Sequence, residues 1–230
     1  MDSYGFQQTH NISVDGGTQK TAYRLSFGYL DEDGILITDK DSYKRYNISS
    51  FVRTEITSWL DLNADIKYSN ATQTSPDQRS LRNWPVLRLA QLLPTYYPTG
   101  QVDIGGQTYD IATPEYAIRN APRQATKNEN IRLFGKMIFK LFPGMTVNAE
   151  YTFNQMNYSA NLYQKSLTFA NGEPSQGFTL DTRFNAANNL YKLTQKRTSH
   201  NAINIYANYD KTFGDHQIGL MGGFNQEHSN

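Results

Sequence analysis

The chain contains no cysteine, which excludes a disulfide framework, a thiolate metal site and a cysteine nucleophile. It has no run of about 18 apolar residues, so the sequence excludes a transmembrane helix. An excess of one charge is also missing, since 22 basic residues oppose 21 acidic ones and leave a formal charge of +1. This balance gives no basis for nucleic-acid binding. The polar segment 1–10 predicts no signal peptide.

Apolar residues are also few, at 38% of the chain, yet aromatic residues alone make up 13%. Aromatic side chains fit pleated, half-buried surfaces, so this composition favours strands over helices. None of these absences excludes a membrane β-barrel, because strands that alternate apolar and polar residues keep the average hydropathy low.

Alternation of apolar and polar residues is the strongest pattern in the chain. Within residues 60–69, Leu62 and Ile66 fall on one face of the expected strand, while Asp61 and Asn63 fall on the other. Such a strand has one apolar face and one wet face. The same pattern occurs at residues 8–15, 23–29, 46–57, 60–69, 131–141, 147–154, 201–210 and 217–225. The sequence therefore predicts about eight antiparallel strands.

Short and long connections alternate between these segments. Short turns are expected at 16–17, 58–59, 143–144 and 214–215, and long links at about 31–42, 71–128 and 159–199. Tight turns at one end and large loops at the other are typical of an outer-membrane barrel. A soluble sandwich or propeller alternates in the same way and stays open as an alternative. The barrel is favoured because rings such as Tyr29 and Tyr68 stand toward strand ends, where aromatic girdles form.

The expected orientation makes this chain a part of something larger. If the short turns are periplasmic, both ends of the chain lie on the extracellular side, whereas a complete bacterial barrel begins and ends in the periplasm. Eight strands could close a small barrel, but it would then be inside out. The predicted fold class is all-β, with residues 1–230 forming an antiparallel transmembrane portion of a larger barrel with long extracellular loops.

Four segments of the chain resemble the barrel of the SusC/RagA-type TonB-linked outer-membrane transporters. They are residues 8–17 (QTHNISVDGG), 20–35 (KTAYRLSFGYLDEDGI), 43–48 (YKRYNI) and 59–62 (WLDL). These motifs cover about the first third of the chain closely. The remainder agrees in the rhythm of its strands and loops.

The resemblance implies a barrel of roughly 22 strands, filled by an N-terminal plug, in the outer membrane of a Gram-negative bacterium of the Bacteroidota. We expect the plug and the C-terminal strands to lie outside this chain. The implied partners are outer-membrane lipid, a SusD-like surface lipoprotein that acts as a lid, and the TonB-ExbB-ExbD complex, which supplies energy through the N-terminal part.

The function implied by the resemblance is active import of large nutrients, with glycans or oligosaccharides first and peptides second. Two alternatives from other classes stay open. One is an outer-membrane adhesin or structural barrel without transport, and the other is a soluble β-sheet binding protein.

The long link 71–128 holds the candidate substrate-binding residues, which are aromatic rings among prolines: Trp84, Tyr96, Tyr97, Tyr109 and Tyr116. Rigid rings on a proline-rich backbone make stacking platforms for sugars or anchors for a partner protein. The alternative is that the loop packs on itself, because so long a connection must bury something to stay ordered. Residues 81–93 predict a short helix that starts near Pro85.

No motif predicts catalysis, a cofactor or a metal. The acidic run at 31–34 lacks the spacing of a calcium loop, and the glycines between 100 and 106 lack the lysine of a phosphate-binding loop. The histidines are far apart and never at the spacing of a zinc-binding helix. We therefore expect a protein that is not an enzyme.

Overall fold

A computed structural model describes residues 5–35, 38–76, 100–111, 116, 119–164, 168–173, 176–182 and 190–230. The strands in these ranges are β1 (Gln7–Gly17), β2 (Thr21–Asp33), β3 (Ser42–Thr57), β4 (Leu60–Pro76), β5 (Gln101–Ile104), β6 (Gln107–Asp110), β7 (Arg123–Phe142), β8 (Met145–Gln164), β9 (Phe169–Glu173), β10 (Gly177–Asp181), β11 (Leu190–Phe213) and β12 (His216–Ser229). Over the same ranges, no helix is long and apolar enough to cross a membrane.

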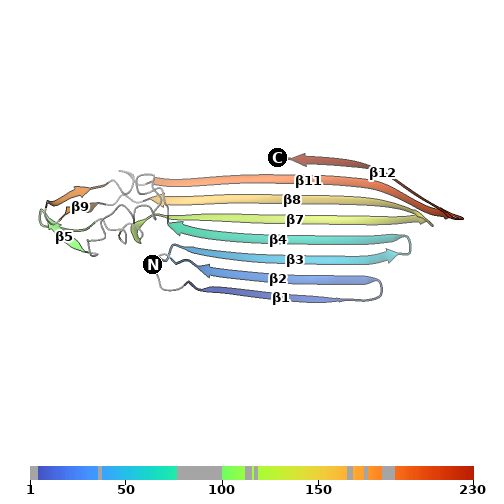
Figure 1. Ribbon diagram of the computed structural model, residues 1–230, viewed down its shortest axis with the longest axis horizontal. Coiled ribbons are helices and arrows are strands. Elements are labelled where there is room, and N and C mark those ends of the chain that lie inside the picture. Colours follow the sequence, from blue (N-terminus) through green and yellow to red (C-terminus); the bar gives the residue numbers. More distant parts are fainter. Residues whose placement is uncertain are drawn as a thin grey trace.

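Eight long strands form one antiparallel sheet in the order β1-β2-β3-β4-β7-β8-β11-β12 (Figure 1). They coincide with the eight segments that the alternation predicts, so this prediction is confirmed. The other four strands form two small hairpins, β5–β6 and β9–β10. Both hairpins lie in the connections that the sequence predicts to be long.

The long strands extend further than the alternating segments, and the extra length lies toward the long connections. The ladders between β4 and β7 and between β8 and β11 both continue past the predicted strand ends. The three long links therefore shorten to 34–41, 77–122 and 165–189. The extensions are held by backbone hydrogen bonds. Their side chains are mostly polar on both faces, so the alternation that marks a strand in the sequence is missing there.

Short turns close the opposite end of the sheet. The predicted turns at 58–59, 143–144 and 214–215 are confirmed. Gly144 has a φ of 90°, a left-handed conformation that L side chains rarely adopt. Its carbonyl accepts a 2.8 Å hydrogen bond from the amide of Asp210, which ties this turn to β11.

The turn between β1 and β2 lies slightly later than predicted. Gly16 and Gly17 still belong to β1, and residues 18–20 reverse the chain. The amide of Thr18 donates to the carbonyl of Thr21 over 2.7 Å, and the Thr18 hydroxyl accepts the Thr21 amide at 3.2 Å. A threonine hydroxyl that bonds its own backbone can close such a turn without glycine.

The register of the sheet places the apolar residues of its strands on one side. Ser50 pairs with Ile66, Ile66 with Leu133, and Leu133 with Phe153. Directly paired residues point to the same side of an antiparallel sheet, so the apolar sets of neighbouring strands merge. We call this side the apolar face; it includes Ile12, Val14, Leu25, Phe27, Ile48, Val52, Leu62, Ile66, Leu133, Met137, Phe153, Ile203, Ile205 and Leu220. The intervening residues form the polar face.

The described part of the chain has almost no core of its own. Its buried hydrophobic residues are Ala121, Leu162, Phe169, Ala170 and Ala202. The apolar face stays open instead, with Ile66 51% and Ile12 65% exposed. A soluble sandwich would cover these side chains with a second sheet, and none packs on them within the described ranges.

The sheet has two free edges, β1 and β12. No pairing within the described ranges joins these two strands, so the eight strands do not close a small barrel by themselves (Figure 1). An open, single-layered sheet with one apolar face is the shape expected of a segment of a wider barrel wall.

Aromatic side chains border the apolar face at both ends. Toward the long connections, the ring centroids of Tyr29 and Tyr46 lie 5.0 Å apart. Toward the turns, Trp59 stacks on Phe139 with centroids 6.3 Å apart. These two rows occupy the positions of the aromatic girdles of a membrane barrel.

Candidate functional site

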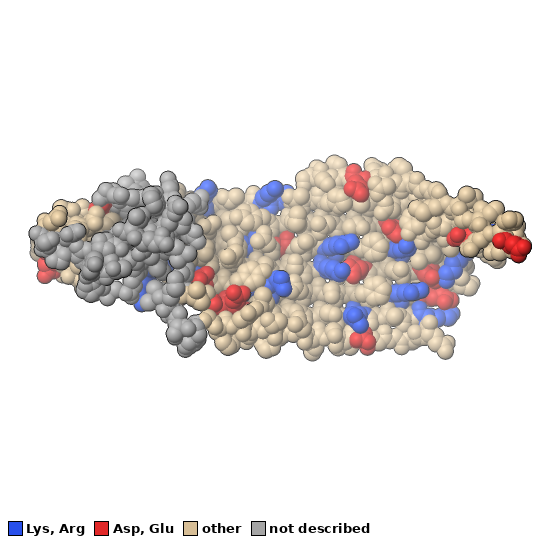
Figure 2. All heavy atoms as spheres, viewed as in Figure 1, with Lys and Arg blue, Asp and Glu red and all other residues tan. Residues whose placement is uncertain are grey.

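The polar face carries charged side chains of both signs. Figure 2 shows basic and acidic groups interspersed over the strands, mostly in the middle of the sheet and toward the turns. The alternation explains this placement, because in the middle of the sheet charged residues such as Lys136 and Glu150 fall on the side opposite the apolar set. The face is therefore strongly polar without a dominant sign of charge.

One network on the polar face ties three strands together. The Nζ of Lys136 on β7 lies 2.9 Å from Oε1 of Glu150 on β8, and it donates to the hydroxyl of Tyr206 on β11 over 2.7 Å. The Tyr206 hydroxyl in turn donates to Glu150 over 2.8 Å. All three side chains are bonded to one another, so the network links three strands and contains no unpaired charge.

A second ion pair lies nearer the turns. Lys140 on β7 reaches Asp61 on β4 over 2.8 Å, and Asp61 is itself only 8% exposed. Other polar groups of this face lack a partner among the described residues, including the Oδ1 atoms of Asn63 and Asn154. Because these two oxygens are buried, a passing solute would not reach them.

The two small hairpins form a separate layer beyond the ends of β7, β8 and β11 (Figure 1). A parallel bridge joins Ile111, just after β6, to Ala170 on β9. The Tyr116 ring packs against Phe169 with centroids 6.1 Å apart, and Phe169 is 2% exposed. Parts of two different long connections are thus folded together at this end of the molecule.

The structure places two of the five candidate binding residues in this layer. The Tyr109 hydroxyl donates over 2.6 Å to Oε1 of Gln107, which lies on the same strand, β6. Burial and the nearby charge of Asp110 raise the pKa of Tyr116. Trp84, Tyr96 and Tyr97 lie outside the described residues, as does the helix predicted at 81–93. Tyr116 packs within the loop layer, in line with the self-packing alternative, while a ligand role for all five residues stays a prediction.

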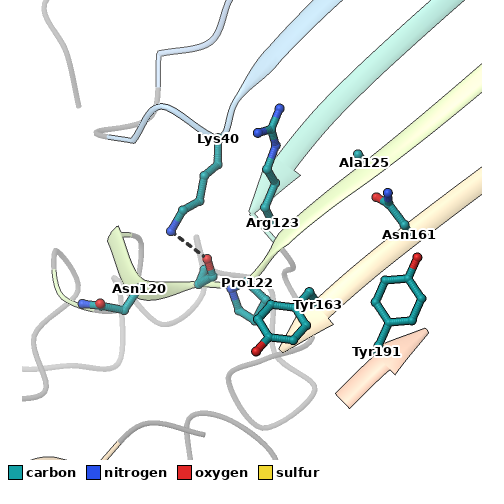
Figure 3. Close-up of a pocket in the computed structure, with 9 residues that line it drawn as sticks. Lys40, Asn120, Pro122, Arg123, Ala125, Asn161, Tyr163 and Tyr191 are labelled. Atoms are coloured by element: carbon teal, nitrogen blue, oxygen red, sulfur yellow. Dashed lines mark hydrogen bonds between the residues drawn. The ribbon is translucent and has the colours of Figure 1, made fainter. Parts of the chain in front are cut away.

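A cavity of about 650 Å³ lies where the loop end of the sheet meets residues 119–121, and no sequence pattern indicated it. Its wall includes Lys40, Asn120, Arg123, Asn161, Tyr163 and Tyr191, which come from separate parts of the chain (Figure 3). Lys40 donates to the carbonyl of Arg119 over 2.5 Å and to that of Ala121 over 3.0 Å. Burial lowers the pKa of Lys40, against the opposing effect of Asp39.

No group of three or more His, Asp or Glu side chains in the described ranges is placed to hold a metal ion. The polar face, as far as the structure describes it, also shows no nucleophile held by a base and an orienting group; its strongest network joins a lysine, a glutamate and a tyrosine that saturate one another. The described part of this face is therefore a polar surface built of paired charges, amides and hydroxyls.

Comparison with known proteins gives a consistent picture. No family model matches the chain. It is 21% identical over 224 residues to TonB-dependent receptor P3 of Formosa agariphila, covering 94% of this chain and 21% of that protein. It is 22% identical over 228 residues to the TonB-dependent receptor SusC of Bacteroides thetaiotaomicron, covering 95% of this chain and 22% of that protein. The chain thus spans about a fifth of the length of these curated relatives.

Solved structures share the fold. A structure of the RagAB peptide transporter superposes with a TM-score of 0.66 at 15% identity, over 97% of this chain and 24% of that one. The RagAB peptide importer in its "open-open" state gives 0.64 at 17% identity, over 94% and 23% respectively. These matches confirm the resemblance to SusC/RagA-type transporters and the fold of an antiparallel barrel portion. The relatives are named as receptors and transporters rather than enzymes.

Proposed function

We propose that this chain forms eight consecutive wall strands of a TonB-dependent outer-membrane transporter that imports large, polar nutrients. One observation carries the proposal: a single-layered antiparallel sheet whose register merges eight apolar sets into one face and eight polar sets into the other. In a closed barrel, the apolar face would meet lipid and the polar face would line the lumen.

The size of the apolar face supports this orientation. From Trp59 to Tyr68, the strand covers about 30 Å at roughly 3.3 Å per residue. At a tilt of about 40°, this length spans about 23 Å along the membrane normal, close to the apolar band of roughly 25 Å in outer-membrane barrels. The rows of rings at both ends then stand at the two membrane interfaces.

The polar face suits passage rather than retention of a solute. Its strongest charges are paired with each other, as in Lys136 with Glu150 and Lys140 with Asp61. The face also presents exposed arginines, Arg53 and Arg132, among amides and hydroxyls that form weak, exchangeable hydrogen bonds. A hydrated glycan or peptide chain could move along such a wall without being trapped by a single strong contact.

Glycans are our first choice of substrate, because polar side chains and tyrosines dominate the surfaces that a solute would meet. Peptides are the second, since the RagAB protein that shares this fold is named as a peptide importer. Trp84, Tyr96, Tyr97, Tyr109 and Tyr116 are the proposed ligand-contacting residues of the long loop. Stacking of sugar or peptide groups on such rings is the chemistry we assign to them.

Two partners complete the proposal. A SusD-like surface lipoprotein would cover the loop end, where the layer of two small hairpins projects beyond the sheet (Figure 1). The TonB-ExbB-ExbD complex would supply energy from the periplasmic side, through parts of the full-length protein outside this chain.

Topology and uptake provide the test. In the full-length protein on intact cells, an epitope inserted near Asn120 or Asn171 should be reachable by antibody, and one at Gly214 should be hidden until the outer membrane is opened. Cells should accumulate a fluorescent oligosaccharide, and an uncoupler of the proton gradient should stop this uptake.

The outcomes separate the alternatives. Accumulation of a labelled oligopeptide but not of the oligosaccharide would select the peptide importer. Surface binding without uptake, unaffected by the uncoupler, would select an adhesin. An exposed epitope at Gly214 together with a hidden one at Asn120 would reverse the orientation and overturn the proposal.

A further inference from the structure

The cavity bounded by Lys40 and Tyr191 lies on the outward side of the wall, the same side as the apolar face. Ala125 pairs directly with Asn161, and Tyr163 pairs directly with Tyr191. Ala125 lies an even number of residues from Ile131 on β7, as Asn161 does from Phe153 on β8 and Tyr191 from Ile203 on β11. The register is uninterrupted between these positions. Side chains at even spacings point to the same side of a strand.

The cavity stands well above the apolar face. From Phe153 to Tyr163 the strand covers about 33 Å, or about 25 Å along the membrane normal at a tilt of about 40°. Acyl chains end at the level of the aromatic row, so in the proposed barrel the cavity lies outside the membrane, in water. It is therefore not part of the lumen and not a lipid-tail site.

The charges of the cavity are of one sign. Arg123 and Lys40 lie on one side of it, with Asn161 and Tyr191 on the other (Figure 3). None of the described residues that line it is acidic. Arg123 is exposed and has no ion-pair partner among the described residues. Its planar guanidinium can take two oxygens of a carboxylate, phosphate or sulfate at once.

Two neighbouring tyrosines supply the flat part of the wall. Tyr163 is 56% exposed and Tyr191 is 63% exposed, although they pair directly across two strands. Exposed rings in water are the surfaces on which the C–H faces of sugars stack. Asn120 and Asn161 add amide donors and acceptors for hydroxyl groups. The volume of about 650 Å³ is within the usual range for small-molecule sites.

We propose that this outward-facing cavity binds an acidic saccharide, with Arg123 and Lys40 at its anionic group and Tyr163 and Tyr191 under its ring. The saccharide can come from two sources that share this chemistry: the anionic sugars of a glycolipid in the surrounding membrane, or a free acidic polysaccharide at the cell surface. The proposal does not depend on transport, because the site is on the outside of the wall.

Binding to the purified full-length protein in detergent tests this proposal without any uptake step. Three probes are used: trigalacturonic acid, deacylated lipopolysaccharide core, and maltotriose as a neutral sugar of similar size. We expect at least one of the two acidic probes to bind at least tenfold more tightly than maltotriose. The acidic probe that binds identifies the source of the saccharide.

Variants locate the binding. Arg123→Gln should weaken acidic-probe binding about tenfold, as expected for loss of one charge-assisted contact, and Arg123→Lys should recover most of it. Tyr163→Ala should weaken it similarly. Lys192→Gln, next to Tyr191 in sequence but on the opposite side of β11, should change nothing.

A folding check accompanies each variant, by its heat-resistant mobility in gels. Equal binding of maltotriose and the acidic probes would overturn the proposal. The same holds for no binding of either acidic probe, or for a folded Arg123→Gln protein that binds as well as the parent.

Discussion

The two ends of the sheet are built from the same strands but in different ways. At the turn end, the strands carry mainly apolar residues on one side and mainly polar or charged residues on the other, and turns of two or three residues close the hairpins. At the loop end, the same strands run on with polar side chains on both sides and lead into long connections. Backbone pairing is continuous through both regions.

This difference shows what the alternation of residues reports. It does not mark where a strand exists, because the ladders continue where it stops. It marks where the two sides of a strand face different media, which in the proposed barrel are lipid on one side and water on the other. Beyond the membrane level of the proposed barrel both sides are wet, so the sequence loses its period while the hydrogen-bonded ladder persists.

The largest expected effect comes from placing a charge within the apolar face of β11. It is compared with the same charge placed on the same side of β11 but nearer the loop end. Ile205→Arg, in the apolar face, should lower the unfolding free energy of the full-length protein in lipid by about 2 to 4 kcal/mol. Leu193→Arg, on the same side but above the aromatic row, should cost about 0 to 1 kcal/mol. Equilibrium unfolding in lipid vesicles measures both.

A third variant at the same height separates the two sides of the strand. Asn204→Arg lies on the polar face, which is proposed to line the lumen, near Glu150, and should cost far less than Ile205→Arg. If Ile205→Arg and Leu193→Arg were equally damaging, height would not matter and the distinction between the two regions would be lost. If Asn204→Arg matched Ile205→Arg, the assignment of the two faces would be wrong.

The turn end and the loop end should also respond differently to the same backbone strain. Gly144→Ala forces a left-handed conformation with φ of 90° in a turn that contacts β11, and should cost about 1 to 2 kcal/mol of global stability. Gly105→Ala imposes similar strain, at φ of 61°, between the short strands β5 and β6. That hairpin can open locally, so global unfolding should change by less than about 0.5 kcal/mol.

Gly135→Ala serves as the control for this pair. Gly135 lies within β7 in an ordinary strand conformation, and a methyl group added to it would meet no other atom within 4 Å, so the variant should be close to neutral. Equal losses for Gly105→Ala and Gly144→Ala would mean that the loop layer unfolds together with the sheet.

The strands at the turn end of the sheet could be predicted because their two sides face different surroundings, which imposes a period of two on the sequence. Leu62 and Ile66 on one side and Asp61 and Asn63 on the other were enough to fix both the element and its faces. The resemblance to SusC/RagA-type transporters supplied the wider barrel, which no single strand reveals.

The loop end of the sheet could not be predicted in the same way. Lys40 meets the carbonyl of Ala121 across 81 positions of sequence, and no local pattern encodes that contact. Tyr163 and Tyr191 were within a predicted loop, yet the ladder of β8 and β11 pairs them directly on the same side of the sheet. Long-range register, rather than composition, creates the cavity, so only the folded sheet reveals it.

The smallest expected effect concerns Lys40, which joins the connection 34–41 to residues 119–121 through two backbone carbonyls. Lys40→Met keeps the length of the side chain and removes both donors. Because these bonds connect loops rather than wall strands, global stability should change by less than about 0.5 kcal/mol. Local opening should become easier by about 1 kcal/mol, which corresponds to roughly fivefold faster amide exchange at 38–41 and 119–121. Lys20→Met in the turn between β1 and β2 is the matched control and should leave all exchange rates unchanged. If faster amide exchange also spread into β4 and β7, the loop end would be stabilising the long strands of the sheet. The two ends of the sheet would then not be independent.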